Sequence, residues 1–196
     1  MRGLSPDMAN QNVIQPWDEK ALAALNAGQI ESALDVLVQG YQQIVLAYCI
    51  ATMGDYAIGE EVALEVFDAI WRALPGFKRE SSFLTWMLAI AHNTCMKRIG
   101  IIGRLRRIFV YGIDKTIMET QPDPSDSPEE VMIKQQQVER LLRALEKLTR
   151  KDRDLIIMLY FEGLSLEAIA QRRSQGRETV RQELLKVQQK LKQIID

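Results

Sequence analysis

The sequence is poor in the residue types that build metal sites and nucleophilic sites. Its 196 residues include two cysteines and one histidine. No cysteine or carboxylate stands at metal-ligand spacing from His92, so we expect no metal and no cofactor. A nucleophile elbow and a Gly-rich phosphate loop are both missing, which argues against an enzyme and against a small-molecule substrate. Cys49 and Cys95 lie inside apolar helical patterns and are predicted to be reduced core residues.

The chain also lacks an excess of charge of either sign. Its 25 Lys and Arg residues against 26 Asp and Glu residues give a net charge of −1, so any nucleic-acid binding must come from local patches. The longest apolar run, Ile44–Met53, is far short of the roughly 18 residues that a membrane span needs. Residues 1–16 contain no apolar segment of the kind found in signal peptides. These absences predict a cytoplasmic protein.

What the sequence does contain is apolar residues at helical spacing along most of its length. No segment shows the sustained alternation of a strand, so the fold class is predicted to be all-α. The predicted helices are residues 18–26, residues 30–53, a helix that follows Asp55 and stops at Pro75, a helix that follows Ser81 or Ser82, residues 131–148, a helix that follows Thr149 and breaks at Gly163, residues 166–172 and residues 177–195.

A change in composition divides the chain into two parts. Residues 114–130 are rich in acids and contain three prolines, and such a stretch cannot bury enough apolar surface to fold alone. The segment Ser127-Pro128-Glu129-Glu130 then forms a capping box with proline at the first helical position. The sequence therefore predicts two small helical domains joined by an acidic, proline-containing linker, with a disordered tail over 1–16, a first domain over 17–100, the linker over 101–127 and a second domain over 128–196.

Four carboxylates lie along the predicted helix after Asp55. Paired carboxylates are compatible with acid–base catalysis, but a solvated acidic face is the favoured interpretation. Because this face flanks apolar residues, it is also suited to docking a basic partner helix. The four residues are Glu60, Glu61, Glu65 and Asp68.

Two further segments have the composition of nucleic-acid sites. The stretch that begins at Phe77 combines aromatic faces, an amide and positive charge, which suits single-stranded nucleic acid. The alternative is that its aromatic residues are core, which we favour for Phe83 and Trp86 and leave open for Phe77. Residues 165–191 have the form of a helix-turn-helix, whose second helix would enter the major groove, or of a helical hairpin with a basic end. Phosphate contacts there are available from Arg172, Arg173, Arg177, Arg181 and Lys186.

Taken together, these segments resemble the bacterial RNA polymerase sigma factors of the extracytoplasmic-function (ECF) group. Residues 54–95, with Gly54-Asp55, Trp71-Arg72-Ala73-Leu74 and Ser81-Ser82-Phe83, are similar to sigma region 2. Residues 145–170, LEKLTRKDRDLIIMLYFEGLSLEAIA, are similar to region 4. The resemblance covers residues 21–191 and implies a non-enzymatic sigma factor that binds core RNA polymerase and directs promoter-specific transcription initiation.

The resemblance also implies partners and contact residues. Docking on the β′ clamp coiled coil of the polymerase would use Glu60, Glu61, Glu65 and Asp68. Capture of a flipped base and the backbone of the −10 element would use Phe77, Lys78, Arg79, Ser82 and Asn93. Contact with the −35 element would use Arg177, Thr179, Arg181, Gln182, Leu185 and Lys186. Region 4 would sit on the β flap, the linker would follow the RNA exit path, and an anti-sigma factor would hold the protein inactive.

The second domain departs from the family pattern at its turn. Arg172 and Arg173 stand where apolar residues pack inward, and Glu183 stands where the reading helix typically has arginine. We therefore expect a loosely packed turn, repulsion between Glu183 and DNA phosphates, and weak −35 recognition. The alternative is that the two arginines point outward and grip phosphate or a partner. These departures keep two other functions open, a polymerase-binding regulator or adaptor and a plain helix-turn-helix DNA-binding regulator.

Overall fold

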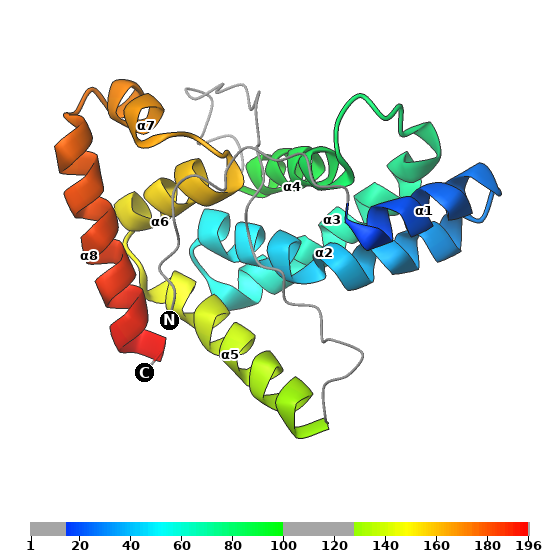
Figure 1. Cartoon of the computed structure of the whole chain (residues 1–196), viewed down its shortest axis with the longest axis horizontal. Helices are drawn as coiled ribbons and strands as arrows, with labels where there is room; N and C mark the ends of the chain where they lie inside the picture. The colour runs from blue at the N-terminus through cyan, green and yellow to red at the C-terminus, as the bar shows by residue number, and fades with distance from the viewer. Residues whose placement is uncertain (1–14, 100–127, 196) are drawn as a thin grey trace.

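The computed structural model describes residues 15–99 and 128–195, and every regular element in these ranges is helical, as predicted (Figure 1). The expected tail, apart from its last two residues, and the expected linker lie outside the described residues. The elements are α1 (Pro16–Asn26), α2 (Ile30–Met53), α3 (Tyr56–Ala73), η2 (Leu74–Gly76), α4 (Phe83–Ile99), α5 (Pro128–Lys147), α6 (Arg150–Ile156), the π-helical turn η4 (Ile157–Phe161), α7 (Leu166–Arg173) and α8 (Arg177–Ile195).

Side-chain caps begin several helices where the sequence predicts them. Asp55, Thr149 and Ser165 each accept a hydrogen bond from the backbone N–H three residues further on. At α4 the cap is Ser82 rather than Ser81, because the Ser82 hydroxyl accepts the backbone N–H of Thr85 at 3.2 Å. Local chemistry therefore sets where α3, α4, α6 and α7 begin.

Helix α2 lies at the centre of the molecule. It packs against α1, α3 and α4, and its other side contacts α5, α6 and η4 (Figure 1). By length and composition alone α2 is apolar enough to cross a membrane, with a mean hydropathy of 1.3, although the sequence pattern predicts no such segment. Half of that window is buried against the rest of the protein.

Close contacts fix α2 against its neighbours in the first domain. A Cβ atom added at Gly59 of α3 would lie 2.8 Å from the Cα atom of Ile50, so the two helix backbones cross without room for a side chain. Helix α1 is held by the buried Asp18, whose carboxylate accepts a hydrogen bond from the Tyr41 hydroxyl at 2.7 Å. Burial, together with Asp18, raises the pKa of Tyr41 far above its usual value, so this hydroxyl remains a donor.

The two domains pack against each other through one continuous apolar cluster. The ring of Tyr48 in α2 meets the ring of Phe161 in η4 edge to face, with centroids 5.3 Å apart. The guanidinium of Arg143 in α5 lies 4.6 Å from the ring centroid of Tyr56 at the start of α3. The sequence predicts two domains on a tether, and it contains no signal for this interface.

The two cysteines are free and buried, as predicted. Their Sγ atoms are 3.9 Å apart across the contact between α2 and α4. The contact with Cys95 raises the pKa of the Cys49 thiol, as does burial, so this thiol is held protonated and unreactive.

Candidate polymerase and nucleic-acid interfaces

Helix α3 places its four carboxylates on the solvent side. Val62, Val66 and Ile70 are fully buried and face the core, so residues on the opposite side of the helix are exposed. The side chains of Glu61, Glu65 and Asp68 are exposed by 60%, 43% and 49%, and Glu60 is exposed as well. The structure therefore brings the predicted polymerase-binding residues together on one face.

Arginines of the same domain hold three of these carboxylates. Arg98, near the end of α4, bridges Glu61 at 2.5 Å and Glu65 at 2.9 Å. Arg72 pairs with Asp68 at 2.5 Å along α3 itself. The sequence does not single out Arg98, because this residue lies more than thirty positions from its partners and only the packing of α4 on α3 brings them together.

Large apolar side chains lie among the carboxylates of α3. Leu64 is 73% exposed and Trp71 is 46% exposed, and their spacing of two helical turns puts them on one side of the helix. An exposed apolar pair with an acidic border has the composition of a protein-docking surface.

The loop between η2 and α4 carries an aromatic cluster. The ring of Phe77 stacks on Phe83 with centroids 4.4 Å apart and an angle of 22°, and it also meets Trp86 at 5.1 Å. Phe83 is buried, as predicted for a core residue, and Phe77 is half-buried. One face of the Phe77 ring is therefore already covered by the protein.

The remaining predicted −10 residues lie around this cluster. Lys78 and Arg79 are exposed, and Arg79 adopts a left-handed backbone conformation with a φ of 61° while its guanidinium bonds the Asn26 side chain of α1. Ser82 caps α4 and is half-buried. Asn93 is exposed on the same side of α4 as Trp86 and lies two turns away, about 10 Å further along the helix.

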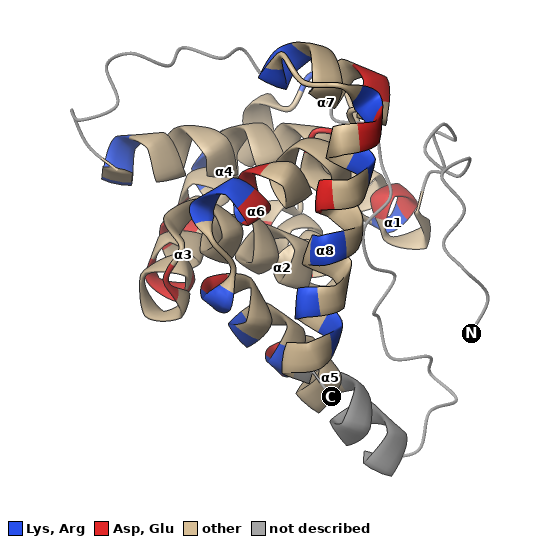
Figure 2. Ribbon diagram, turned by 90° about the vertical axis from the view of Figure 1, so that its left-hand side faces the viewer, with Lys and Arg blue, Asp and Glu red and all other residues tan. Residues whose placement is uncertain are grey.

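Helices α7 and α8 form the predicted helix-turn-helix. Ile169 and Val180 are fully buried between the two helices, and Ser174 ends α7 in a left-handed conformation with a φ of 52°. All of the predicted −35 residues are exposed on α8: Arg177, Thr179, Arg181, Gln182, Leu185 and Lys186. Figure 2 shows acidic and basic bands over the first half of α8 and basic bands over the second half.

Acidic side chains hold part of the basic surface at the start of α8. Glu178 accepts two hydrogen bonds from Arg181 at 2.8 Å and one from Gln182 at 2.8 Å. These donors lower the pKa of Glu178 to about 2. Arg177 pairs with Glu167 of α7 at 2.5 Å. DNA phosphates would therefore compete with the protein's own carboxylates for Arg177 and Arg181.

The turn arginines have internal partners, which corrects the expectation of a loosely packed turn. Arg173 pairs with Glu183 at 3.1 Å, and its side chain is only 13% exposed. Arg172 bonds Glu162 at the end of η4. The Glu183 side chain therefore points toward α6 and α7, and ion pairs take the place of the apolar packing that the family pattern has there. Nothing in the sequence pairs Lys151 with Glu183 or Glu162 with Arg172, so the roles of Lys151 and Glu162 are visible only in the structure.

His92 belongs to a cleft of about 330 Å³ between α2, α4 and α6. Its Nδ1 atom lies 2.9 Å from the Tyr48 hydroxyl, and burial lowers the pKa of the imidazole. The wall opposite is formed by Arg153 and Glu162. Within the described ranges, no cluster of three His, Cys, Asp or Glu residues is arranged to hold a metal.

Comparison with known proteins matches both parts of this architecture. The family model for Sigma-70 region 2 matches residues 37–100, and the model for Sigma-70 region 4 matches residues 138–191. The first match contains α3 and the aromatic loop, and the second contains the helix-turn-helix. The predicted correspondence of the two segments to regions 2 and 4 is therefore confirmed.

Individual relatives support the same assignment. The RNA polymerase sigma-H factor of Pseudomonas aeruginosa is 30% identical over 80% of this chain and 82% of its own length. The ECF RNA polymerase sigma-E factor of Escherichia coli is 29% identical over 71% of this chain and 74% of its own length. Longer sigma factors also match, and the chain spans 42% and 36% of the length of two of them.

A structural relative is the sigma factor RpoE in complex with the anti-sigma factor NepR from Bartonella quintana, which is 16% identical with a TM-score of 0.38 over 93% of this chain and 98% of that chain. The two family-model matches agree with the resemblance that the sequence motifs indicate. The Pseudomonas aeruginosa relative, which matches over most of both chains, agrees with it as well. The chain belongs to the ECF group of RNA polymerase sigma factors, non-enzymatic subunits that direct promoter-specific transcription initiation.

Proposed function

We propose that the solvent face of α3 is the surface that docks on the β′ clamp coiled coil of core RNA polymerase. The observation that carries this proposal is the exposure of Leu64 and Trp71 between the carboxylates of the same helix face. Apolar side chains at the centre of an interface provide most of its binding energy, and a charged border selects a basic partner. The contacts of Arg98 with Glu61 and Glu65 would be exchanged for contacts with the partner.

The −10 site on this proposal is the aromatic loop with Asn93. Phe77 is half-buried, so part of its ring is available to stack on an unpaired base, and contacts with Phe83 and Trp86 hold the ring in place. Lys78 and Arg79 are exposed beside it and suit backbone phosphates. Ser82 caps α4 and thereby fixes the end of the loop.

The −35 site is the exposed side of α8, with region 4 seated on the β flap. Arg177, Arg181 and Lys186 would approach phosphates and base edges, and Thr179, Gln182 and Leu185 lie on the same exposed surface. This proposal has four further parts. They are the domain boundaries at residues 17–100 and 128–196, the path of the linker, the cytoplasmic location and control by an anti-sigma factor. They are supported by the resemblance to the ECF group.

The test is co-purification of the full-length chain with core polymerase. We expect Glu61→Lys with Glu65→Lys to weaken binding about 10-fold or more, because like charges meet in a docked interface. Leu64→Glu should weaken it to a similar extent. The matched control is Glu31→Lys with Asp35→Lys, which makes the same charge change on the exposed side of α2.

A second control separates docking from internal ion pairs. Arg98→Ala removes the two internal salt bridges and leaves both carboxylates available, so polymerase binding should be retained. Unchanged affinity of the Glu61 and Glu65 double variant, with helicity intact, would show that this face of α3 does not dock.

The adaptor function remains the second candidate, and one observation favours it. Arg181 and Gln182 are both held by Glu178, so the reading surface of α8 is partly neutralised by the protein itself. A polymerase-binding regulator with weak −35 recognition would show this feature. Multi-round transcription with core polymerase distinguishes the two, since a sigma factor initiates at its promoter without another sigma subunit.

A further inference from the structure

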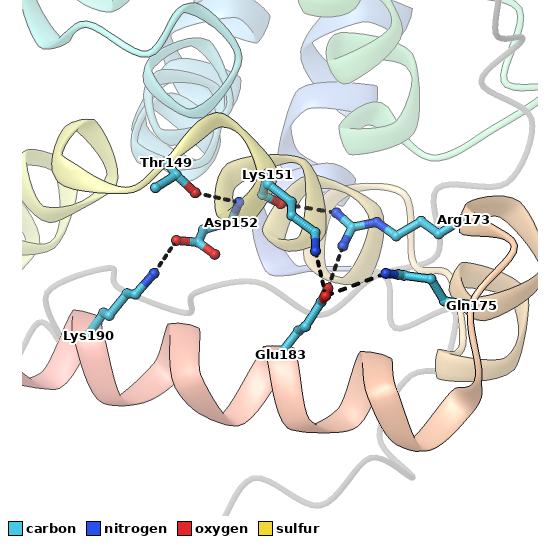
Figure 3. A network of polar contacts seen from close by, with 7 residues as sticks. All are labelled: Thr149, Lys151, Asp152, Arg173, Gln175, Glu183 and Lys190. Carbon is cyan, nitrogen blue, oxygen red and sulfur yellow. Dashed lines mark hydrogen bonds and ion pairs between the residues drawn. The ribbon is translucent and has the colours of Figure 1, made fainter.

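Glu183 is the centre of a polar cluster that joins three elements of the second domain (Figure 3). Its carboxylate accepts Lys151 Nζ of α6 at 2.5 Å and Arg173 Nη1 of α7 at 3.1 Å. Gln175 Nε2, from the turn, lies at 3.4 Å. Although Glu183 is on the helix assigned to DNA reading, its side chain is only 22% exposed.

Arg173 ties the cluster to the backbone as well. Its second terminal nitrogen, Nη2, donates to the carbonyl oxygen of Lys151 at 3.0 Å. The guanidinium therefore spans from the start of α6 to the side of α8, and both directions of its planar fork are occupied. Because the side chain is 13% exposed, it is not available to DNA phosphates.

A second contact braces α8 at its other end. Lys190 Nζ lies 2.6 Å from Asp152 Oδ2, and the backbone N–H of Asp152 is held by the Thr149 hydroxyl at 3.2 Å (Figure 3). Lys151 and Asp152 are adjacent on α6, while Glu183 and Lys190 are two turns apart on α8. Helix α8 is therefore attached at two points to the capped first turn of α6. These two attachments fix the angle between α6 and α8.

We propose that Lys151, Arg173 and Glu183 are positioning residues that set the orientation of α8 on promoter DNA, with Asp152–Lys190 as the second brace. This inference rests on the proposed function, in which α8 reads the −35 element. On this view Glu183 supports recognition of the −35 element by holding α8 in position, and it does not repel DNA phosphates. Its partners also hold the pKa of Glu183 below its usual value, so the carboxylate is charged at neutral pH.

The test uses holoenzyme assembled from the full-length chain and core polymerase. Transcription is compared between a promoter with an intact −35 element and one with a scrambled −35 element, both with the same −10 element. We expect Glu183→Gln to lower the ratio of the two activities by about 3- to 10-fold, because a loosely held helix loses part of the discrimination that base contacts provide. Activity on the scrambled promoter should stay unchanged, a result that general unfolding would not give.

Matched variants make the result specific. Glu146→Gln removes an exposed carboxylate of α5 and should leave the ratio unchanged. Arg173→Gln should lower the ratio as Glu183→Gln does, and the double variant should be no worse than either single variant, because each residue acts through the other. Circular dichroism melting identifies any variant that does not fold. In that case Lys151→Met tests the same cluster through its most exposed residue, and we expect a smaller drop in the ratio of the two activities.

The outcomes separate this inference from the proposed function. If the wild-type holoenzyme transcribes equally from the promoters with an intact and a scrambled −35 element, the proposed role of α8 in reading that element is wrong. If the wild type depends on the −35 element and Glu183→Gln keeps the full ratio, the positioning role is overturned. A gain in −35 dependence in Glu183→Gln would also overturn it, because it would mean that the carboxylate repels DNA.

Discussion

The two halves of the molecule share one apolar cluster, but ion pairs add more to the second half than to the first. In the first domain, α2 is surrounded by apolar side chains and crosses α3 at Gly59 with no space between the backbones. In the second domain, α8 packs against α5, α6 and α7 with Val180 and Val187 buried, and a series of ion pairs also joins it to α6 and α7. Apolar burial does not itself titrate with pH, while partly exposed ion pairs depend on pH and are screened by salt.

This difference suits the task proposed for each domain. A domain that separates DNA strands must keep its own shape while it holds an unpaired base, and dense packing provides that rigidity. A domain that reads a duplex from a few side chains needs a defined angle between helices, which directional ion pairs and hydrogen bonds can set. The comparison shows that two neighbouring helical domains can combine apolar packing and ion pairs in different proportions.

The largest expected effect comes from cutting the contact between the domains. Phe161→Ala removes a side chain that is 2% exposed and meets Tyr48, so we expect a loss of about 3–4 kcal/mol in unfolding free energy. All three tryptophans, Trp17, Trp71 and Trp86, lie in the first domain. Urea unfolding followed by tryptophan fluorescence and by circular dichroism should coincide in the wild type and separate in the variant.

The control for this experiment is Phe161→Leu, which keeps most of the apolar volume and should cost less. Coincident unfolding curves for Phe161→Ala, with a loss below about 1 kcal/mol, would contradict the idea that the two halves stabilise each other through this ring.

The next largest effect tests the packing of the first domain. Gly59→Ala places a Cβ atom 2.8 Å from the Cα atom of Ile50 and 2.9 Å from its backbone nitrogen, and a backbone cannot move aside as a side chain can. We expect a loss of about 1–3 kcal/mol, measured by urea unfolding. Gly76→Ala is the control, because an added Cβ there meets nothing within 4 Å. Equal stability of the two variants would show that the helix crossing tolerates a methyl group.

Acidification should weaken the second domain before the first. The pKa values of Glu183 and Asp152 are lowered in the folded protein, Glu183 chiefly by its hydrogen bond from Lys151 and Asp152 by those from Lys190 and Thr149, which outweigh burial. A carboxyl with a lowered pKa contributes stability above its unfolded value of about 4, and that stability is lost as the pH falls through the folded value. Hydrogen exchange should show α8 opening below pH 4 while α2 stays protected. Simultaneous opening would contradict the comparison.

The smallest expected effect concerns the turn of the helix-turn-helix. Ser174 has a φ of 52°, a conformation that costs a residue with a Cβ atom more than it costs glycine. Ser174→Gly should therefore raise the free energy of unfolding by up to about 1 kcal/mol. Ser174→Ala keeps the backbone strain and should not raise it. A destabilised glycine variant would mean that the serine hydroxyl contributes more than the backbone strain costs.

Much of the fold could be predicted because its signals are local. A cap such as Asp55 or Thr149 acts on a backbone group three residues away, and helical periodicity is visible within a short window. The exposure of the α3 carboxylates follows from the same periodicity, since Val62 and Val66 on the other face must be buried. The family motifs lie within these local segments, and this is why regions 2 and 4 could be identified without the structure.

The long-range contacts could not be predicted in the same way. Lys151 and Glu183 are 32 residues apart, and Arg98 is 33 residues from Glu65. At such separations a charged residue has many possible partners, and the packing of helices decides which one is within reach. This is why the sequence predicts repulsion between Glu183 and DNA phosphates, whereas in the structure this carboxylate pairs with Lys151 and Arg173.

The sequence by itself determined the helical class, the helix ends and the membership of the ECF sigma factors, because each depends on residues that are neighbours along the chain. Tertiary structure alone decided that α2 contacts both domains, that Phe77 stacks on Phe83, and that the turn arginines pair with acidic partners of the same domain. The physical reason is the distance over which each interaction is specified. Hydrogen bonds within a helical turn follow from local order, whereas the partner of a ring or a charge is set when distant helices pack together.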